Sequence, residues 1–136
     1  MLRKDAKIAL IERVPLFQRC SKRELREIAG LTTELALPAG RDLTAEGVPG
    51  REFVVLVDGA ADVRRGGRRI ASLQSGDFLG ELALVTGKPR IATVTTTAPS
   101  RLLVITADDF RRLMRDVPSI QTKILQAVAS RLPADS

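Results

Sequence analysis

The fold class follows most directly from residues 53–73, FVVLVDGAADVRRGGRRIASL. An apolar run at 53–57 leads into Asp58-Gly59, and a second short run leads into Gly66-Gly67 before the chain returns. Both pairs are typical of tight turns between antiparallel strands. The sequence shows no βαβ alternation. It therefore predicts an α+β, mainly β, protein: an antiparallel β-roll or jelly-roll-like barrel over residues 33–106.

Helices are predicted on both sides of the roll, over residues 4–31 and 107–132. Ser21 followed by Glu24 is a capping-box signature, and apolar residues then recur at helical spacing. Thr106 precedes a similar pattern at the start of the closing helices. We therefore expect a roll flanked by N-terminal and C-terminal helices.

Length and composition limit the possible functions. The 136 residues suit a single domain spanning 1–136, and its net charge of +6 favours anionic partners. There is no His, Trp or Tyr, which excludes histidine catalysis and imidazole metal ligation. Cys20 is the single cysteine, so it forms no internal disulfide or thiolate cluster, and we assign it no role. We expect no metal and no cofactor.

The sequence carries no targeting signal that we recognise. Lys7 and Glu12 interrupt the apolar residues near the start, so no signal-peptide core forms. No apolar run approaches the roughly 20 residues that a membrane helix needs. We expect a cytoplasmic protein, or a soluble piece of a larger one, with no membrane segment.

Residues 78–94, FLGELALVTGKPRIATV, carry the clearest chemical pattern. Gly80 permits a close backbone approach, and one helical turn after it would offer free N–H groups to an anion. Arg90 would add a charge-assisted clamp, and Glu81 suits a sugar hydroxyl better than a phosphate. This combination indicates a ribose-phosphate site. The alternatives are that Arg90 is an ordinary solvated strand residue and that Glu81 only caps the short helix.

This stretch resembles the phosphate-binding cassette of cyclic-nucleotide-binding domains. That family includes the catabolite activator protein, regulatory subunits of cyclic-AMP-dependent kinase and cyclic-nucleotide-gated channels. The resemblance covers roughly residues 14–120. Its motifs are Gly80-Glu81-Leu82-Ala83-Leu84, Pro89-Arg90-x-Ala92-Thr93-Val94, Glu46-Gly47-x-x-Gly50-x-x-Phe53, Gly59 and Gly76-Asp77-Phe78.

The resemblance implies a role for each matching residue. Glu81 would accept the ribose 2′-hydroxyl, and Arg90 would pair with the cyclic phosphate. Backbone amides around Leu82, Ala83 and Ile91 would complete the phosphate site. The predicted binding residues are Gly80, Glu81, Leu82, Ala83, Arg90, Ile91 and Ala92. The ligand would bind without being turned over, so the resemblance implies no enzyme activity.

Two departures from the family pattern concern the choice between cyclic AMP and cyclic GMP and the residues that would cover the bound ligand. Relatives often carry Ser, Thr or Ala directly after the arginine, and Thr there accompanies a preference for cyclic GMP. Ile91 has no hydroxyl, which favours cyclic AMP over cyclic GMP. Without Trp or Tyr, any lid is expected to be aliphatic, from Leu125, Val128 or Leu132; the same apolar stripe also suits core packing or a dimer contact.

A rival interpretation rests on the run Arg64-Arg65-Gly66-Gly67-Arg68-Arg69. Four arginines around a hairpin tip suit a nucleic-acid backbone, as in a sequence-independent binding module. The residues after 106 are taken up by the closing helices, so no DNA-reading helix-turn-helix fits. We therefore expect a sensor domain that switches its helices on binding and signals to an effector partner or domain outside this chain. A homodimer is compatible with this prediction.

Overall fold

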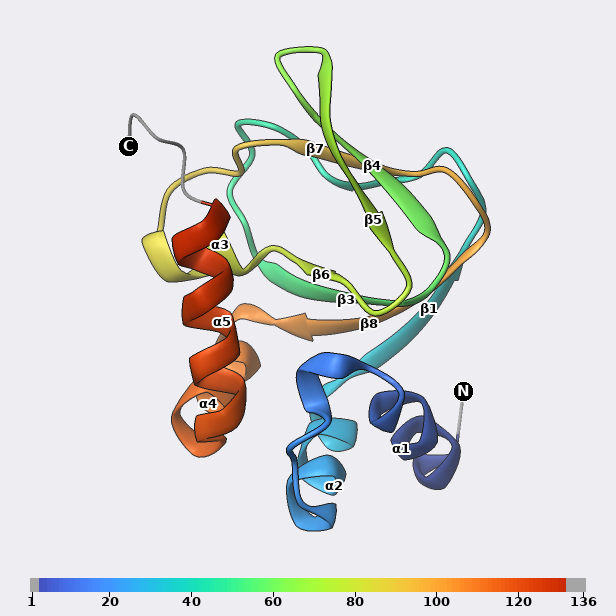
Figure 1. Ribbon diagram of the computed structural model, residues 1–136, viewed down its shortest axis with the longest axis vertical. Coiled ribbons are helices and arrows are strands. Elements are labelled where there is room, and N and C mark those ends of the chain that lie inside the picture. The colour runs from blue at the N-terminus through green and yellow to red at the C-terminus, as the bar shows by residue number, and fades with distance from the viewer. Residues whose placement is uncertain (1–2, 132–136) are drawn as a thin grey trace.

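The computed structural model describes residues 3–131, and their core is two four-stranded antiparallel sheets (Figure 1). The first sheet has the order β1-β8-β3-β6, with β1 Thr33–Leu37, β8 Ser100–Thr106, β3 Glu52–Asp58 and β6 Phe78–Leu79. The second has the order β2-β7-β4-β5, with β2 Asp42–Thr44, β7 Thr93–Thr96, β4 Ala60–Arg65 and β5 Arg68–Gln74. The predicted α+β roll is confirmed.

Helices precede, interrupt and follow the strands. They are α1 Lys4–Glu12, the 3-10 helix η1 Pro15–Phe17, α2 Lys22–Leu31, α3 Glu81–Thr86, α4 Ala107–Asp116 and α5 Pro118–Arg131. The capping box at the start of α2 is confirmed, since Ser21 and Glu24 each accept the other's backbone N–H. Thr106 caps α4 by accepting from the N–H of Asp109 at 3.3 Å.

β3 is buried on both faces, which explains why its sequence is a continuous apolar run. Phe53, Val55 and Val57 pack with the flanking helices in the larger core. Val54 and Leu56 face the other way, into a smaller core between the two sheets. The strand therefore joins the helices to the interior of the roll.

The turn at Asp58-Gly59 lies where it was predicted, but it joins no hairpin. β3 pairs with β6 and β8, whereas β4 pairs with β5 and β7, so the turn carries the chain from one sheet to the other. Gly59 has φ of 126°, and a Cβ there would lie 2.1 Å from Ser100 Oγ. The glycine is needed because the crossing chain passes directly against β8.

The second predicted turn forms a true hairpin. β4 and β5 pair up to Arg65 and Arg68, and both intervening glycines have positive φ, 60° and 77°. This hairpin extends beyond the rest of the roll in Figure 1.

The N-terminal helices and the pair α4 and α5 cover the first sheet on the same side (Figure 1). Ile120, Ile124 and Val128 of α5 are buried in this core. The ammonium group of Lys123 also donates to the carbonyl of Pro15, which ties α5 to η1. Among the described residues, no helix combines the length and apolar character needed to cross a bilayer.

Candidate ligand-binding site

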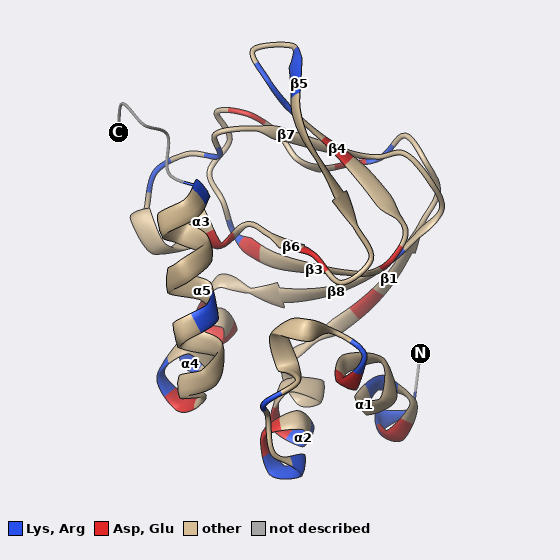
Figure 2. Ribbon diagram, viewed as in Figure 1, with Lys and Arg blue, Asp and Glu red and all other residues tan. Residues whose placement is uncertain are grey.

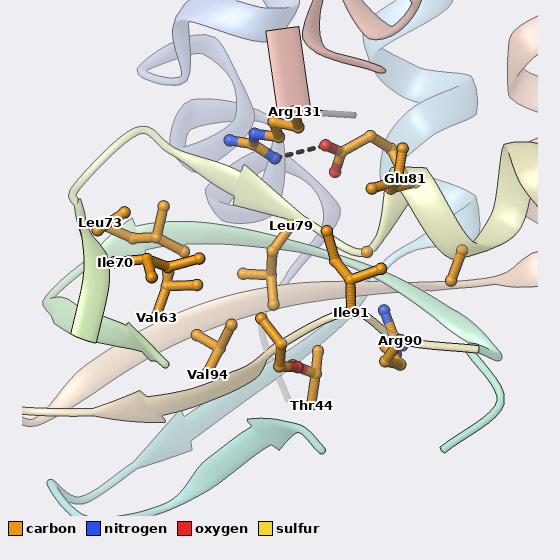
Figure 3. Close-up of a pocket in the computed structure, with 15 residues that line it drawn as sticks. Thr44, Val63, Ile70, Leu73, Leu79, Glu81, Arg90, Ile91, Val94 and Arg131 are labelled. Carbon is orange, nitrogen blue, oxygen red and sulfur yellow. Dashed lines mark hydrogen bonds and ion pairs between the residues drawn. The ribbon is translucent and has the colours of Figure 1, made fainter. Parts of the chain in front are cut away.

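A pocket of about 250 Å³ lies between the second sheet and α3. One wall is apolar and comes from the hairpin side chains Val63, Ile70 and Leu73, while Glu81 and Arg90 lie across from them (Figure 3). The pocket thus has an apolar end and a charged end, a division typical of small-molecule sites.

Gly80 sets the geometry of the charged end. It has φ of 98° and is the residue before α3. A Cβ at this position would lie 2.5 Å from the carbonyl oxygen of Glu52 and 2.8 Å from Nη1 of Arg90. Glycine therefore allows the chain to turn into α3 and leaves room for the arginine. The first amides of α3 have no acceptor within their own helix.

Arg90 is held on a loop through its backbone. Its N–H donates to the carbonyl of Val48 at 2.9 Å, and its carbonyl accepts from the N–H of Gly47 at 2.8 Å. In the side chain, Nη2 donates to the carbonyl of Glu52 at 3.0 Å. Nη1 is buried and has no hydrogen-bond partner within residues 3–131. One terminal nitrogen of the guanidinium group is therefore bonded to the protein, and the other has no protein partner among the described residues.

Burial lowers the pKa of Arg90, because desolvation disfavours its charged form, while the carboxylates of Glu52 and Glu81 oppose that shift. An arginine remains protonated at neutral pH even so. A half-buried cation of this kind is stabilised by an anionic group, which a ligand can supply.

Glu81, the first residue of α3, is 1% exposed. Its Oε1 accepts from Nη1 of Arg131 at 2.5 Å (Figure 3). Its Oε2 is buried and has no partner in the described part of the chain. One carboxylate oxygen is thus occupied by the protein, and the other is an unused acceptor.

Arg131 is a pocket residue that our sequence analysis missed. It ends α5, and besides Glu81 it donates to the carbonyl of Phe78 at 2.8 Å. Its guanidinium carbon lies 5.0 Å from the centre of the Phe78 ring. Its position in the sequence could have identified it. Arg131 follows Ile124 and Val128 at helical spacing, so it is a charged residue on the buried stripe of α5.

The structure brings the predicted binding residues together. All seven line the pocket: Gly80, Glu81, Leu82, Ala83, Arg90, Ile91 and Ala92. Thr44, which the sequence analysis also missed, lines it as well, and its hydroxyl donates to the carbonyl of Ala92 at 3.0 Å.

Two of the three residues predicted as a lid do not line the pocket. Leu125 is 50% exposed, and Val128 is buried in the core, so α5 turns these side chains away from the pocket. Leu132 lies outside the described residues. Within the described part of α5, the residue that reaches the pocket is Arg131, a polar contact where an aliphatic one was expected.

Comparison with known proteins agrees with this arrangement. Residues 34–117 match the model of the family described as the cyclic nucleotide-binding domain. The cAMP-dependent protein kinase regulatory subunit of Aspergillus niger is 34% identical over 117 residues, which cover 85% of this chain and 28% of that protein. A cyclic nucleotide-gated potassium channel of Rhizobium etli is 33% identical over 122 residues, covering 90% of this chain and 34% of that protein. The chain thus spans about a third or less of these relatives.

Solved structures share the fold. The regulatory domain of Toxoplasma gondii PKA, crystallised with cAMP, superposes with a TM-score of 0.82 and 24% identity, covering 96% of this chain and 51% of that one. The regulatory subunit of a cAMP-independent protein kinase A from Trypanosoma brucei superposes with a TM-score of 0.81 and 17% sequence identity. This match covers 91% of this chain and 47% of that one. Together with the family match, these comparisons show that the chain belongs to the cyclic nucleotide-binding domain family, a non-catalytic family of regulatory domains.

Proposed function

We propose that the pocket binds cAMP, with the ribose 2′-hydroxyl at Glu81 and the cyclic phosphate at Arg90. The observation that carries this proposal is the pair of unused buried atoms. Oε2 of Glu81 is an acceptor and Nη1 of Arg90 is a cationic donor, and both residues line the same pocket. Buried polar atoms without partners are costly, so a ligand that satisfies both gains affinity from each.

The rest of the pocket suits a purine base. Val63, Ile70 and Leu73 offer an apolar surface, and Ile70 is 54% exposed before a ligand covers it. Burying that surface against a flat ring is favourable. A simple inorganic anion would satisfy Arg90 but would leave both Glu81 and the apolar wall unused.

Titration of the protein with cAMP and cGMP, by calorimetry and by thermal shift, tests this function. We expect cAMP to bind with a nanomolar-to-micromolar dissociation constant and to raise the unfolding temperature, because it binds the folded state. Absence of both heat and thermal shift at millimolar cAMP and cGMP would contradict the proposal.

Selectivity for cAMP over cGMP is expected because Ile91 offers no hydroxyl to the guanine ring. Ile91 lines the pocket and directly follows Arg90. Ile91→Thr should narrow the difference in affinity by several-fold, since one added hydrogen bond contributes about 0.5–1.5 kcal/mol. Ile91→Val is the matched control, since it shortens the side chain without adding a hydroxyl. Equal affinities of the wild type for the two nucleotides would overturn this inference.

We infer that ligand binding is transmitted to α5 through Arg131, and from there to an effector partner or domain. A ligand hydroxyl on Oε2 would fix the Glu81 carboxylate, and Oε1 of that group already holds Arg131. The last turn of α5 would then be held more firmly against Phe78. The ligand would act by favouring one position of the helix over others.

This transmission predicts a change in hydrogen exchange. In the wild type, cAMP should slow amide exchange in the last turn of α5. Arg131→Ala should abolish that protection while cAMP still binds, since Arg90 and Oε2 of Glu81 remain in the pocket and Arg131 bonds to neither of them. Gln126→Ala, at an exposed position of the same helix, should behave as the wild type. Ligand protection that persists in Arg131→Ala would rule out this route.

A further inference from the structure

The tip of the β4–β5 hairpin carries four arginines around its two glycines, seen as the blue end of the hairpin in Figure 2. Their register places Arg64 opposite Arg69 and Arg65 opposite Arg68. Like charges directly opposite each other destabilise a strand pair. The repulsion between these arginines therefore destabilises the hairpin unless negatively charged groups neutralise them.

The two pairs lie on different faces of the hairpin. The register of β4 and β5 shifts between Val63 and Arg64. Asp62 nevertheless pairs with both Arg64 and Arg69, so these three side chains share one face of the hairpin. Alternation along β4 then places Arg65 on the other face, with Val63. Val63 lines the ligand pocket, which identifies its face as the inner one. Residues paired across the strands point to the same side, so Arg68 joins Arg65 on the inner face, and Arg69 joins Arg64 on the outer face.

The outer pair has a carboxylate and the inner pair has none. Asp62 lies 3.6 Å from Arg64 and 3.7 Å from Arg69. Within residues 3–131, neither Arg65 nor Arg68 has a carboxylate oxygen within 4.0 Å. Glu46 reaches the tip, but its Oε1 accepts the backbone N–H of Gly66 at 3.0 Å. Among the described residues, the inner pair therefore makes no ion pair, and the nearby Glu46 carboxylate bonds to the backbone of the tip.

The tip is also connected to the nucleotide pocket. Glu46 is followed by Gly47 and Val48, the two residues whose backbone holds that of Arg90. The Glu46 contact thus fixes the tip to the loop behind the arginine. Arg65 lies two residues beyond Val63, or about 7 Å along the strand from the pocket wall. A molecule bound to the inner pair would lie beside the pocket mouth.

We propose that Arg65 and Arg68 form a docking point for an acidic segment of a partner protein. Guanidinium groups pair with carboxylates through two parallel hydrogen bonds, and two adjacent arginines fit a short run of Asp or Glu. A nucleic-acid backbone fits less well, because its affinity grows with the number of phosphates neutralised and the inner face offers two cations. The docking point itself does not depend on a bound nucleotide.

The test compares two double variants with the same change in charge. A fluorescein-labelled octaglutamate peptide is titrated against the wild type, Arg65→Ser/Arg68→Ser and Arg64→Ser/Arg69→Ser at low ionic strength, with fluorescence anisotropy as the readout. The inner-face variant should lose about tenfold in affinity, and the outer-face variant about twofold or less. Circular dichroism melting confirms that both variants fold.

Three outcomes overturn the proposal. One is the absence of peptide binding to the wild type, and another is an equal loss in the two double variants, which would reflect net charge alone. The third is tighter binding of a single-stranded oligonucleotide of the same charge, which would make the tip a nucleic-acid site. Each outcome is independent of the cAMP titration, so this proposal and the proposed ligand can fail separately.

Discussion

Arg90→Ala is expected to weaken cAMP binding by at least tenfold. A hydrogen bond to a charged group contributes about 1.5–3 kcal/mol, and about 1.4 kcal/mol corresponds to a factor of ten in the dissociation constant. The guanidinium group is already positioned for the phosphate, because Nη2 is bonded to the carbonyl of Glu52 and Nη1 is left free. Isothermal titration calorimetry measures the change directly.

Two further variants distinguish a direct contact between Arg90 and the phosphate from a general effect of positive charge. Arg90→Lys keeps the positive charge but loses the planar fork, so its affinity should fall between the wild type and Arg90→Ala. Arg51→Ala removes a charge close to Arg90 but outside the pocket, and should change the affinity by about twofold or less at physiological salt. If Arg51→Ala and Arg90→Ala weaken binding equally, the phosphate does not bind at Arg90.

Features set by neighbouring residues could be predicted from the sequence. The capping box at Ser21 and Glu24 and the glycine turn at residues 66–67 each depend on a few consecutive positions. The clustering of the cassette residues is similar, since Gly80 and Arg90 are ten positions apart on one connected loop and helix. Their fixed spacing made the cassette recognisable, although contacts with Gly47, Val48 and Glu52 hold Arg90 in place.

Features that depend on distant contacts could not be predicted in this way. The pair Asp58-Gly59 favours a hairpin locally, but β3 pairs with β6 and β8 while β4 pairs with β5 and β7, so the turn crosses between sheets. The contact between Glu81 and Arg131 joins residues 50 positions apart, and the docking of α5 determines it. The lid residues were expected on the pocket side of α5, yet Val128 packs into the core that α5 shares with the first sheet.

The fold by itself does not identify the ligand. Similar TM-scores relate this chain to a PKA regulatory domain crystallised with cAMP and to the regulatory subunit of a kinase described as cAMP-independent. A shared fold accommodates different ligands, so specificity has to be argued from the site. Here the argument rests on Glu81 and Arg90, whose free atoms match one hydroxyl and one phosphate.

The free oxygen of Glu81 predicts a second large effect, measured with 2′-deoxy-cAMP. The wild type should bind cAMP at least tenfold more tightly than the deoxy analogue, because a hydroxyl that donates to a buried carboxylate contributes about 1.5–3 kcal/mol. Glu81→Ala should bind the two nucleotides within about twofold of each other, since the acceptor is gone. The two ligands and two proteins form a thermodynamic cycle that isolates this single contact.

Arg131→Ala is the control that distinguishes the two oxygens of the Glu81 carboxylate. It removes the partner of Oε1 but leaves Oε2, so the preference for cAMP over the deoxy analogue should persist even where the overall affinity changes. If Arg131→Ala loses the preference as completely as Glu81→Ala, the ion pair positions Glu81 for the ribose. If Glu81→Ala retains the preference, the ribose hydroxyl is bound elsewhere, and Oε2 has a different role. The comparison therefore distinguishes binding of the ribose hydroxyl, which we assign to Oε2, from positioning of α5, which we assign to Oε1.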